Sequence, residues 1–251
     1  NKFEFRMLGS SQSIASPNVV LNTIMAQELE EFADILEQSN DFQVDLQNLL
    51  HDTFKAHQRI IFNGNGYGED WVQEAQRRGL SNLRDTVDCM PAYIDPKNIR
   101  LFAGHNILSE TEMRARYEIH LENYCKVTAI EASTLRDMVL RGILPAVNRY
   151  TADLTQAILH KRELVVPCRV EEDLLQKLSA LTGSLYDTMA AINEAMDKAP
   201  DAEGGIDAAR YYREEIVRRM EEARQSIDQL ESLTAAKYWP YPTYADILFS
   251  V

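Results

Sequence analysis

The spacing of apolar and polar residues changes along the chain, and it predicts a mainly α-helical protein that begins with a strand. Residues 2–8 alternate in polarity with a period of two, which is typical of a β-strand. From residue 17 onward, apolar residues recur every three or four positions, so we expect helices in the rest of the chain. The polar face of the expected strand carries Lys2, Glu4 and Arg6.

Glycines and prolines divide the first part of the chain into separate expected helices. Ser16 and Pro17 have the residue types of an N-cap followed by a first helical position, and the helix that they open should bury a broad apolar stripe. The glycine-rich segment 63–68 should end the second helix, and Gly79 the third. The expected helices cover 17–38, 41–62 and 69–78, with short helical pieces within 81–105.

Longer amphipathic helices are expected from Ser109 onward. Ser109 and Glu112 have the spacing of a capping box, in which each side chain accepts a hydrogen bond from the other residue's backbone N–H. Gly142 and Pro145 should interrupt the helix that follows. Two more helices, on either side of the polar link 198–205, complete a long antiparallel helical bundle. The sequence therefore predicts two domains, 1–108 and 109–251.

Composition and charge exclude several classes of protein. The 251 residues are 45% hydrophobic, which fits a folded globular chain, and the net charge of −13 argues against nucleic acid or anionic lipid as a partner. No apolar run approaches the length of a membrane span. Three widely spaced cysteines form no disulfide or zinc pattern, so we expect a cytoplasmic protein. The first residue is Asn1, and we expect a longer parent protein.

Glu4 and Arg6 are the strongest candidate pair for metal binding or catalysis in this sequence. Residues two apart on a strand leave the same face, roughly 6.5–7 Å apart along the backbone. A carboxylate in that position can bind a divalent cation, and a guanidinium can bind a carboxylate or a phosphate. The spacing by itself favours a solvated charge pair on one side of a sheet over such a site.

The remaining motifs favour structural roles. The segment 63–68 lacks the lysine of a phosphate-binding loop and follows a helix, so a tight turn is favoured over a nucleotide site. The five histidines have no metal-binding spacing, and no serine or cysteine lies in a nucleophile motif. The aromatic, proline-rich tail after residue 237 has two interpretations: it covers its own bundle, or it anchors in a neighbouring subunit.

Several segments together resemble one family, the glutamine synthetases, and within it the C-terminal part of the large type III enzymes. The matching segments extend over nearly the whole chain. They are Lys2-Phe-Glu-Phe-Arg-Met-Leu-Gly-Ser-Ser-Gln-Ser, Ser16-Pro-Asn, Val20-Leu-Asn-Thr, Ile61-Phe-Asn-Gly-Asn-Gly-Tyr, Arg116-Tyr-Glu-Ile, Ile143-Leu-Pro-Ala-Val and Tyr238-Trp-Pro-Tyr-Pro-Thr-Tyr-Ala-Asp-Ile-Leu-Phe.

The resemblance implies ATP-dependent ligation of ammonia to glutamate through a γ-glutamyl phosphate. It implies bound Mg²⁺ or Mn²⁺ and a site shared between subunits of stacked hexameric rings, as in a dodecamer. The family's Glu-x-Arg strand motif falls on Glu4 and Arg6, so Glu4 is expected to be a metal ligand in the catalytic β-barrel. Arg6 is expected to be a catalytic residue that contacts glutamate or the transferred phosphoryl group. The strand at 2–8 would then be the remnant of that barrel.

The family's other metal ligands, its nucleotide-contacting segment and its upstream substrate arginines have no counterpart in this sequence. We therefore expect the chain to be inactive alone, because one carboxylate and one arginine cannot position all the reactants. The helical bundle would serve ring assembly or subunit contact. The alternative interpretation is a non-enzymatic helical scaffold or oligomerisation module.

Overall fold

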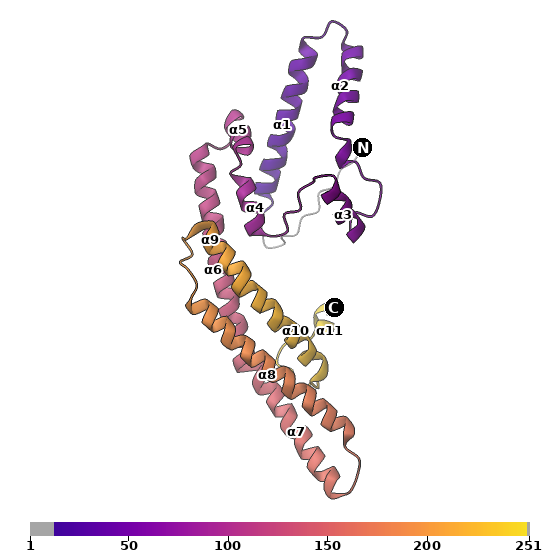
Figure 1. Cartoon of the computed structure of the whole chain (residues 1–251), viewed down its shortest axis with the longest axis vertical. Coiled ribbons are helices and arrows are strands. Elements are labelled where there is room, and N and C mark those ends of the chain that lie inside the picture. Colours follow the sequence, from indigo (N-terminus) through magenta and orange to yellow (C-terminus); the bar gives the residue numbers. More distant parts are fainter. Residues whose placement is uncertain (1–12, 250–251) are drawn as a thin grey trace. The chain divides into compact units, whose positions relative to one another are not determined.

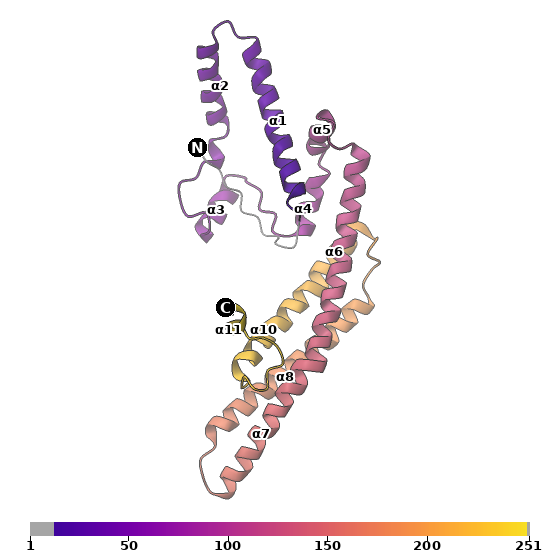
Figure 2. The same cartoon turned by 180° about the vertical axis from the view of Figure 1, so that it is seen from behind.

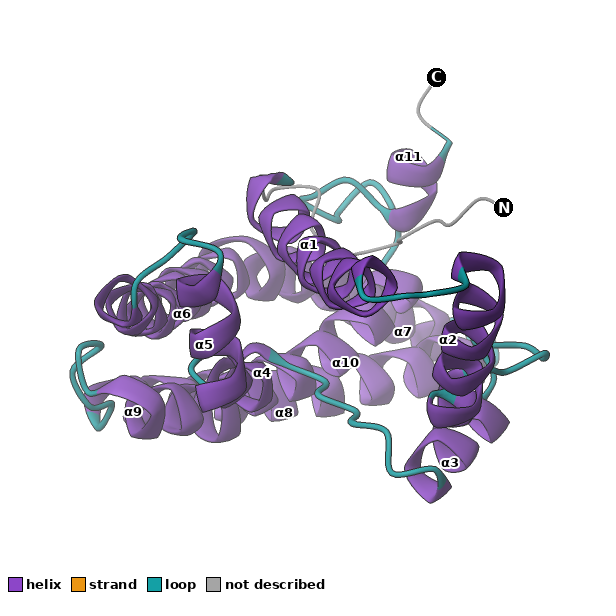
Figure 3. Ribbon diagram, turned by 90° about the horizontal axis from the view of Figure 1, so that it is seen from above, coloured by secondary structure: helices purple, strands orange, loops and turns teal. Residues whose placement is uncertain are grey.

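The computed structural model describes residues 13–249 of the chain, which fold into helices joined by loops (Figure 3). No β-strand occurs among these residues, and the mainly helical class is confirmed for them. The expected strand at 2–8 lies outside the described residues. The chain divides into two compact units, residues 1–117 and residues 118–251. No helix within 13–249 has the length and apolar character needed to cross a membrane.

The first unit contains short and medium helices close to the expected positions. Helices α1 and α2 lie side by side as a hairpin (Figures 1 and 2). Asp41, Asp85 and Asp95 begin three of the helices, and each carboxylate accepts a hydrogen bond from a backbone N–H of the first turn. The elements are α1 (Ala15–Glu37), α2 (Phe42–Ala56), the 3₁₀ turn η1 (Gln58–Ile60), α3 (Glu69–Arg77), α4 (Thr86–Tyr93) and α5 (Pro96–Gly104).

Two expected helix boundaries in this unit are wrong. Helix α1 begins at Ala15, with Ile14 in the N-cap position, so Ser16 does not cap it. Pro17 lies inside the first turn, which tolerates proline because the N–H groups there have no partner within the helix. Helix α2 ends at Ala56 rather than at residue 62, because the chain changes to η1 and then to extended backbone at Ile61.

The apolar stripe of α1 is exposed, contrary to the sequence prediction. Thr23 is the one buried residue of α1, while Ile24, Met25 and Leu29 are 42%, 56% and 59% exposed. Nearby apolar side chains of α2, such as Phe54, are exposed as well. The helical spacing was interpreted correctly, but no element among residues 13–117, the described part of the first unit, covers the stripe. We call the exposed apolar side chains of this helix hairpin the α1–α2 apolar face; they are Val20, Ile24, Met25, Leu29, Ile35, Val44, Leu50 and Phe54.

The second unit consists mainly of long helices. Helix α6 begins in the first unit and continues into the second. Ser109 and Glu112 make the expected capping box at the start of α6, with Glu112 accepting from the Ser109 N–H at 2.8 Å. Helices α7 and α8 form one antiparallel hairpin, and α10 returns along α8 (Figures 1 and 2). The elements are α6 (Glu110–Met138), η2 (Val139–Ile143), α7 (Leu144–Glu163), α8 (Arg169–Asp197), α9 (Gly205–Tyr211), η3 (Tyr212–Val217), α10 (Arg218–Leu233) and α11 (Tyr244–Leu248).

Apolar side chains from α6, α8 and α10 form the core of this unit. The expected heptad-like seam of α8 is confirmed in part, because four of its residues are buried: Leu178, Leu185, Met189 and Ile192. Full burial of one such side chain contributes about 1.5–3 kcal/mol relative to exposure, so the seam supplies much of the stability of the bundle. The core residues with at most 1% exposure include Leu121, Val139, Val147, Leu178, Leu185, Met189, Ile192, Ile216 and Leu230.

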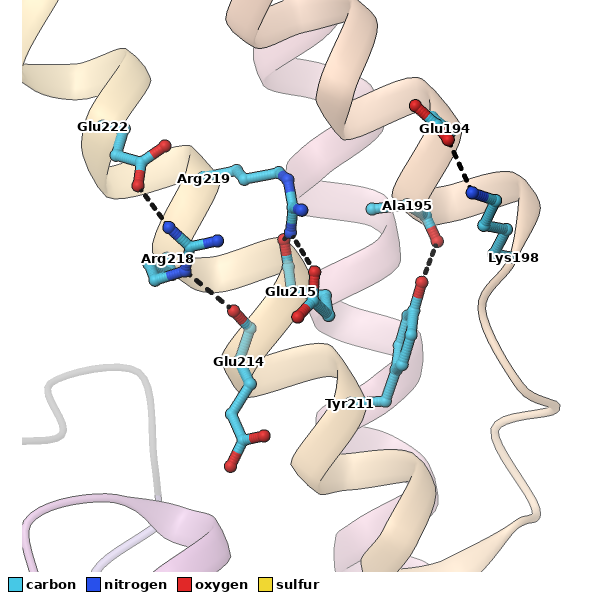
Figure 4. A network of polar contacts seen from close by, with 9 residues as sticks. All are labelled: Glu194, Ala195, Lys198, Tyr211, Glu214, Glu215, Arg218, Arg219 and Glu222. Atoms are coloured by element: carbon cyan, nitrogen blue, oxygen red, sulfur yellow. Dashed lines mark hydrogen bonds and ion pairs between the residues drawn. The ribbon is translucent and has the colours of Figure 1, made fainter.

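Two π-helical turns interrupt the long helices. The first, η2, contains Gly142 and is followed by Pro145 in the first turn of α7, where the sequence predicts an interruption. The second, η3, contains neither glycine nor proline and was not expected. There the Arg218 Nε donates to the Glu214 carbonyl at 3.1 Å, and Arg219 donates to the Glu215 carbonyl (Figure 4). These side-chain bonds stabilise carbonyls of the irregular turn.

The aromatic tail packs on its own bundle, as one of its two interpretations predicts. The Tyr238 ring lies 5.2 Å from the Tyr150 ring of α7, and the Tyr238 hydroxyl donates to Asp153. The Tyr241 hydroxyl donates to the Met138 carbonyl at 3.3 Å, next to η2. Anchoring of the tail in a neighbouring subunit stays a prediction.

Gly142→Ala tests the close approach of the tail to η2. An alanine Cβ at position 142 would lie 2.5 Å from the Tyr241 hydroxyl oxygen, whereas a Cβ at Gly183 in α8 would meet no atom within 4 Å. Gly183→Ala should raise the free energy of unfolding by about 0.5–1 kcal/mol, because alanine is the better helix former. We expect Gly142→Ala to unfold at lower denaturant, about 1 kcal/mol or more below Gly183→Ala, because Tyr241 must move. Equal stabilisation by both variants would contradict this packing.

Candidate functional site

The residues predicted to form the site, Glu4 and Arg6, lie outside the described residues. Within residues 13–249, no three side chains among His, Cys, Asp and Glu gather in a way that could hold a metal ion. The described part of the chain therefore does not fit a complete divalent-cation site. A bound Mg²⁺ or Mn²⁺ would need Glu4 together with ligands from further polypeptide.

The three cysteines are free thiols, and two of them, Cys125 and Cys168, lie in environments that disfavour the thiolate. Cys168 donates to the Glu172 carboxylate at 3.1 Å, and this hydrogen bond raises the pKa of the Cys168 thiol. Burial raises the pKa of the Cys125 thiol. Because the reactive form of cysteine is the thiolate, both environments disfavour covalent chemistry.

Two of the histidines, His105 and His51, make local structural contacts. His105, at the end of α5, pairs through its Nε2 with the Gln27 side chain at 3.0 Å and lies 3.6 Å from a Glu30 oxygen. His51 pairs with its neighbour Asp52 on the surface of α2. The first contact ties α5 to α1, and neither histidine faces a cluster of catalytic groups.

Arginines near the α8–α10 contact are neutralised by acidic neighbours. Arg218 donates to Glu222 at 2.6 Å and Arg219 to Glu215 at 2.5 Å (Figure 4). Nearby, Lys198 donates to Glu194 at 2.5 Å and lowers the pKa of that carboxyl. Since each of these cations has a carboxylate partner, the network is not an anion-binding site.

The glycine-rich segment 63–68 forms a tight turn, as the sequence predicts. The Asn65 side chain accepts a hydrogen bond from the Tyr67 N–H at 3.1 Å, and the Asn65 carbonyl accepts from the Gly68 N–H at 3.2 Å. Because one side chain organises the loop locally, no ligand is needed to order its backbone.

A cation and two aromatic rings hold both ends of this turn. Phe62 and Trp71 stack with their ring centroids 4.2 Å apart, and the Arg78 guanidinium lies 5.9 Å and 5.7 Å from the two rings. Arg78 also donates to the carbonyls of Arg59 and Ile61, at 3.1 and 2.8 Å. This aromatic–arginine cluster helps to explain why the expected second helix stops early, since Arg78 binds one carbonyl of η1 and that of the extended residue Ile61 after it.

Glu74 completes the cluster by orienting Arg78. The Arg78 Nε donates to Glu74 at 2.5 Å, and the Arg77 guanidinium donates to the same carboxylate through two nitrogens. These hydrogen bonds, first from Arg77 and then from Arg78, lower the pKa of Glu74 to about 2. The carboxylate therefore stays ionised at neutral pH.

Sequence reasoning missed this cluster, although aromatic residues at both ends of the turn and an arginine seven residues beyond Trp71 are a usable signal. The cluster contains no nucleophile and no general acid or base with a pKa near neutrality. Its role is to hold the segment from Ile61 to Trp71, which presents Tyr67 at 86% exposure. The described residues thus contain a rigid surface turn and no catalytic constellation.

Gly64→Ala tests whether the turn depends on the stacked rings. An alanine Cβ at position 64 would lie 2.5 Å from the Phe62 ring, and one at Gly66 would meet no atom within 4 Å. In a Trp239→Phe background, which leaves Trp71 as the one tryptophan, Gly64→Ala should shift the tryptophan emission and cost about 1 kcal/mol of stability. Gly66→Ala should leave the emission unchanged, and equal spectra for both variants would rule out the stacked arrangement.

Comparison with known proteins identifies the family. The family model described as the glutamine synthetase C-terminal domain matches residues 45–162. A glutamine synthetase of Butyrivibrio fibrisolvens is 34% identical over 242 residues, which are 96% of this chain and 33% of that protein. The Type-3 glutamine synthetase of Dictyostelium discoideum is 33% identical over 263 residues, which are 99% of this chain and 35% of the relative.

A third relative shows the same similarity to glutamine synthetases. The glutamine synthetase of Bacteroides fragilis is 29% identical over 260 residues, which cover 100% of this chain and 36% of that protein. The chain spans about a third of the length of these curated relatives. The resemblance seen in its sequence motifs is thereby confirmed along nearly the whole chain, and the chain belongs to the glutamine synthetase family.

Proposed function

We propose that the chain works as the C-terminal part of a glutamine synthetase of type III, which uses ATP to join ammonia to glutamate through a γ-glutamyl phosphate. One observation carries this proposal: relatives that bear the name glutamine synthetase match 96% or more of the chain. A scaffold without enzymatic function is not favoured, because a match of this extent includes the Glu-x-Arg segment as well as the helices.

Glu4 and Arg6 would be this chain's contribution to the catalytic centre. An acidic side chain supplies the hard oxygen ligand that Mg²⁺ or Mn²⁺ prefers. A guanidinium is always charged and planar, so it suits the carboxylate of glutamate or the oxygens of a transferred phosphoryl group. Both residues belong to the alternating segment 2–8, which would project them from one face.

The rest of the centre would come from polypeptide outside this chain, and we expect the chain alone to be inactive. Residues 13–249 hold no group of three metal-ligating side chains. The relatives are about three times as long as this chain, which is ample length for further ligands and for a nucleotide site.

The α1–α2 apolar face supports a role within a larger protein. Leu29 and Phe54 are 59% and 64% exposed, and Ile24 and Met25 are 42% and 56% exposed. Apolar patches of this extent are uncommon on independent proteins and mark surfaces that pack against something else. We propose that the catalytic part of the ligase covers this face.

The helical bundle would serve contacts between subunits of the ring assembly. Its outer surface on α6 carries Ile119, Val127 and Ile130, which are 60%, 42% and 66% exposed. These side chains recur at helical spacing and lie outside the buried seam, so they offer a second apolar contact surface. Such a surface suits the stacked hexameric rings that the family resemblance implies.

Glu4→Ala in the full-length protein tests the proposed function. Loss of one oxygen ligand should lower the activity more than ~10-fold at limiting Mn²⁺ or Mg²⁺ and raise the metal concentration needed for half-maximal rate. γ-Glutamyl transfer and metal titration measure both effects, while circular dichroism checks the fold. Glu163→Ala removes an exposed carboxylate at the end of α7 and should change neither. Unchanged metal dependence in Glu4→Ala would contradict the ligand role.

A further inference from the structure

The second unit contains an apolar cavity to which the proposed function assigns no role. It has a volume of about 330 Å³ and lies between the bundle and the aromatic tail. Leu135 and Met138 of α6 and Ile227 of α10 form its floor, and Trp239 and Tyr241 of the tail line the other side. A volume of this size lies at the lower end of the range for small-molecule sites. We call it the tail cavity.

Several independent contacts hold the tail cavity open. Next to its floor, the π-helical turn η2 brings Gly142 so close to Tyr241 that a side chain there would collide with the hydroxyl. At the other end, the Tyr244 N–H donates to the Glu231 carboxylate at 3.0 Å, and Thr243 and Asp246 form a capping box that begins α11. The walls are therefore fixed by the fold. π-Helical turns of this kind are frequent at functional sites.

The charged groups at the rim of the cavity have a net negative charge. Arg224 donates to Asp228 at 2.8 Å and to the Tyr244 hydroxyl, so its charge is already neutralised. Glu231 accepts one hydrogen bond, from the Tyr244 backbone, and no basic side chain within residues 13–249 forms an ion pair with it. The rim thus offers one carboxylate to a bound cation, beside aromatic rings whose faces also attract positive charge.

We propose that the tail cavity binds a small organic cation of the arylalkylamine class, with its apolar body against Leu135, Met138 and Ile227. Its ammonium group pairs with Glu231 at the rim. The cavity excludes water from the apolar part of the ligand, while the carboxylate selects cations over neutral or anionic molecules of the same shape. The proposal does not depend on the proposed ligase activity.

Trp239 reports directly on occupancy of the cavity. The chain has two tryptophans, so Trp71→Phe leaves Trp239 as the one tryptophan. Phenethylamine, ethylbenzene and phenylpropionate have similar apolar bodies and differ in charge, and each is titrated against the fluorescence of the Trp71→Phe chain. We expect a saturable change with phenethylamine, at a concentration ~10-fold or more below that needed for phenylpropionate.

Glu231→Gln separates the charge from the shape of the site. Glutamine retains an oxygen that accepts from the Tyr244 N–H, so the tail should stay in place while the negative charge is lost. Binding of phenethylamine should weaken about 10-fold in Glu231→Gln and stay unchanged in Glu221→Gln, a matched variant at an exposed position of the same helix.

Four results would overturn the proposal. Equal binding of the three probes, or unchanged binding in Glu231→Gln, would show that no cation is selected. Absence of any saturable change would show that the cavity takes no small molecule. Trp239 emission that depends on protein concentration, without a response to phenethylamine, would assign the cavity to a segment of a second copy of the chain.

Discussion

Close packing of leucine, isoleucine and methionine side chains along α6, α8 and α10 is the interaction that organises the second unit. Leu185 and Ile216 lose essentially all of their solvent exposure in this seam. With the three helices fixed against one another, the π-helical turn η2 has a defined position, and the tail can return to it through Tyr241. The tail cavity exists because a bulky aromatic segment covers a seam that is already closed beneath it.

The first unit is stabilised by different interactions. A few specific interactions stabilise it: aspartate caps at helix N-termini, the His105 contact between α5 and α1, and the cluster of Phe62, Trp71 and Arg78. Its longest helix, however, buries only Thr23 and leaves an apolar stripe in water. A helix of this composition gains little stability without a partner surface. The exposed stripe is the feature on which we base the proposal that the catalytic part of the ligase covers α1 and α2.

Features that depend on neighbouring residues could be predicted from the sequence. The capping box of Ser109 and Glu112, the helix stop before Gly79 and the interruption at Gly142 follow from short-range rules. The α8 seam was predictable because helical periodicity directly encodes a buried face. The turn at 63–68 was predicted as structural because it lacks the residues of a phosphate-binding loop.

Features that depend on distant partners could not be predicted in the same way. Arg78 shortens the expected second helix through carbonyls 17 and 19 residues away, and η3 has no glycine or proline to signal it. Periodicity showed that α1 is amphipathic but could not show that its apolar stripe is exposed in the first unit. The roles of Glu4 and Arg6 rest on family resemblance, since a period of two fixes only their common face.

Amide hydrogen exchange, measured on this chain alone and on the full-length protein, tests most directly whether α1 and α2 are one half of a larger interface. The account predicts that amides of α1 and α2 exchange much more slowly in the full-length protein, while those of α8 and α10 exchange at similar rates in both. Equally rapid exchange of α1 and α2 in both proteins would contradict it.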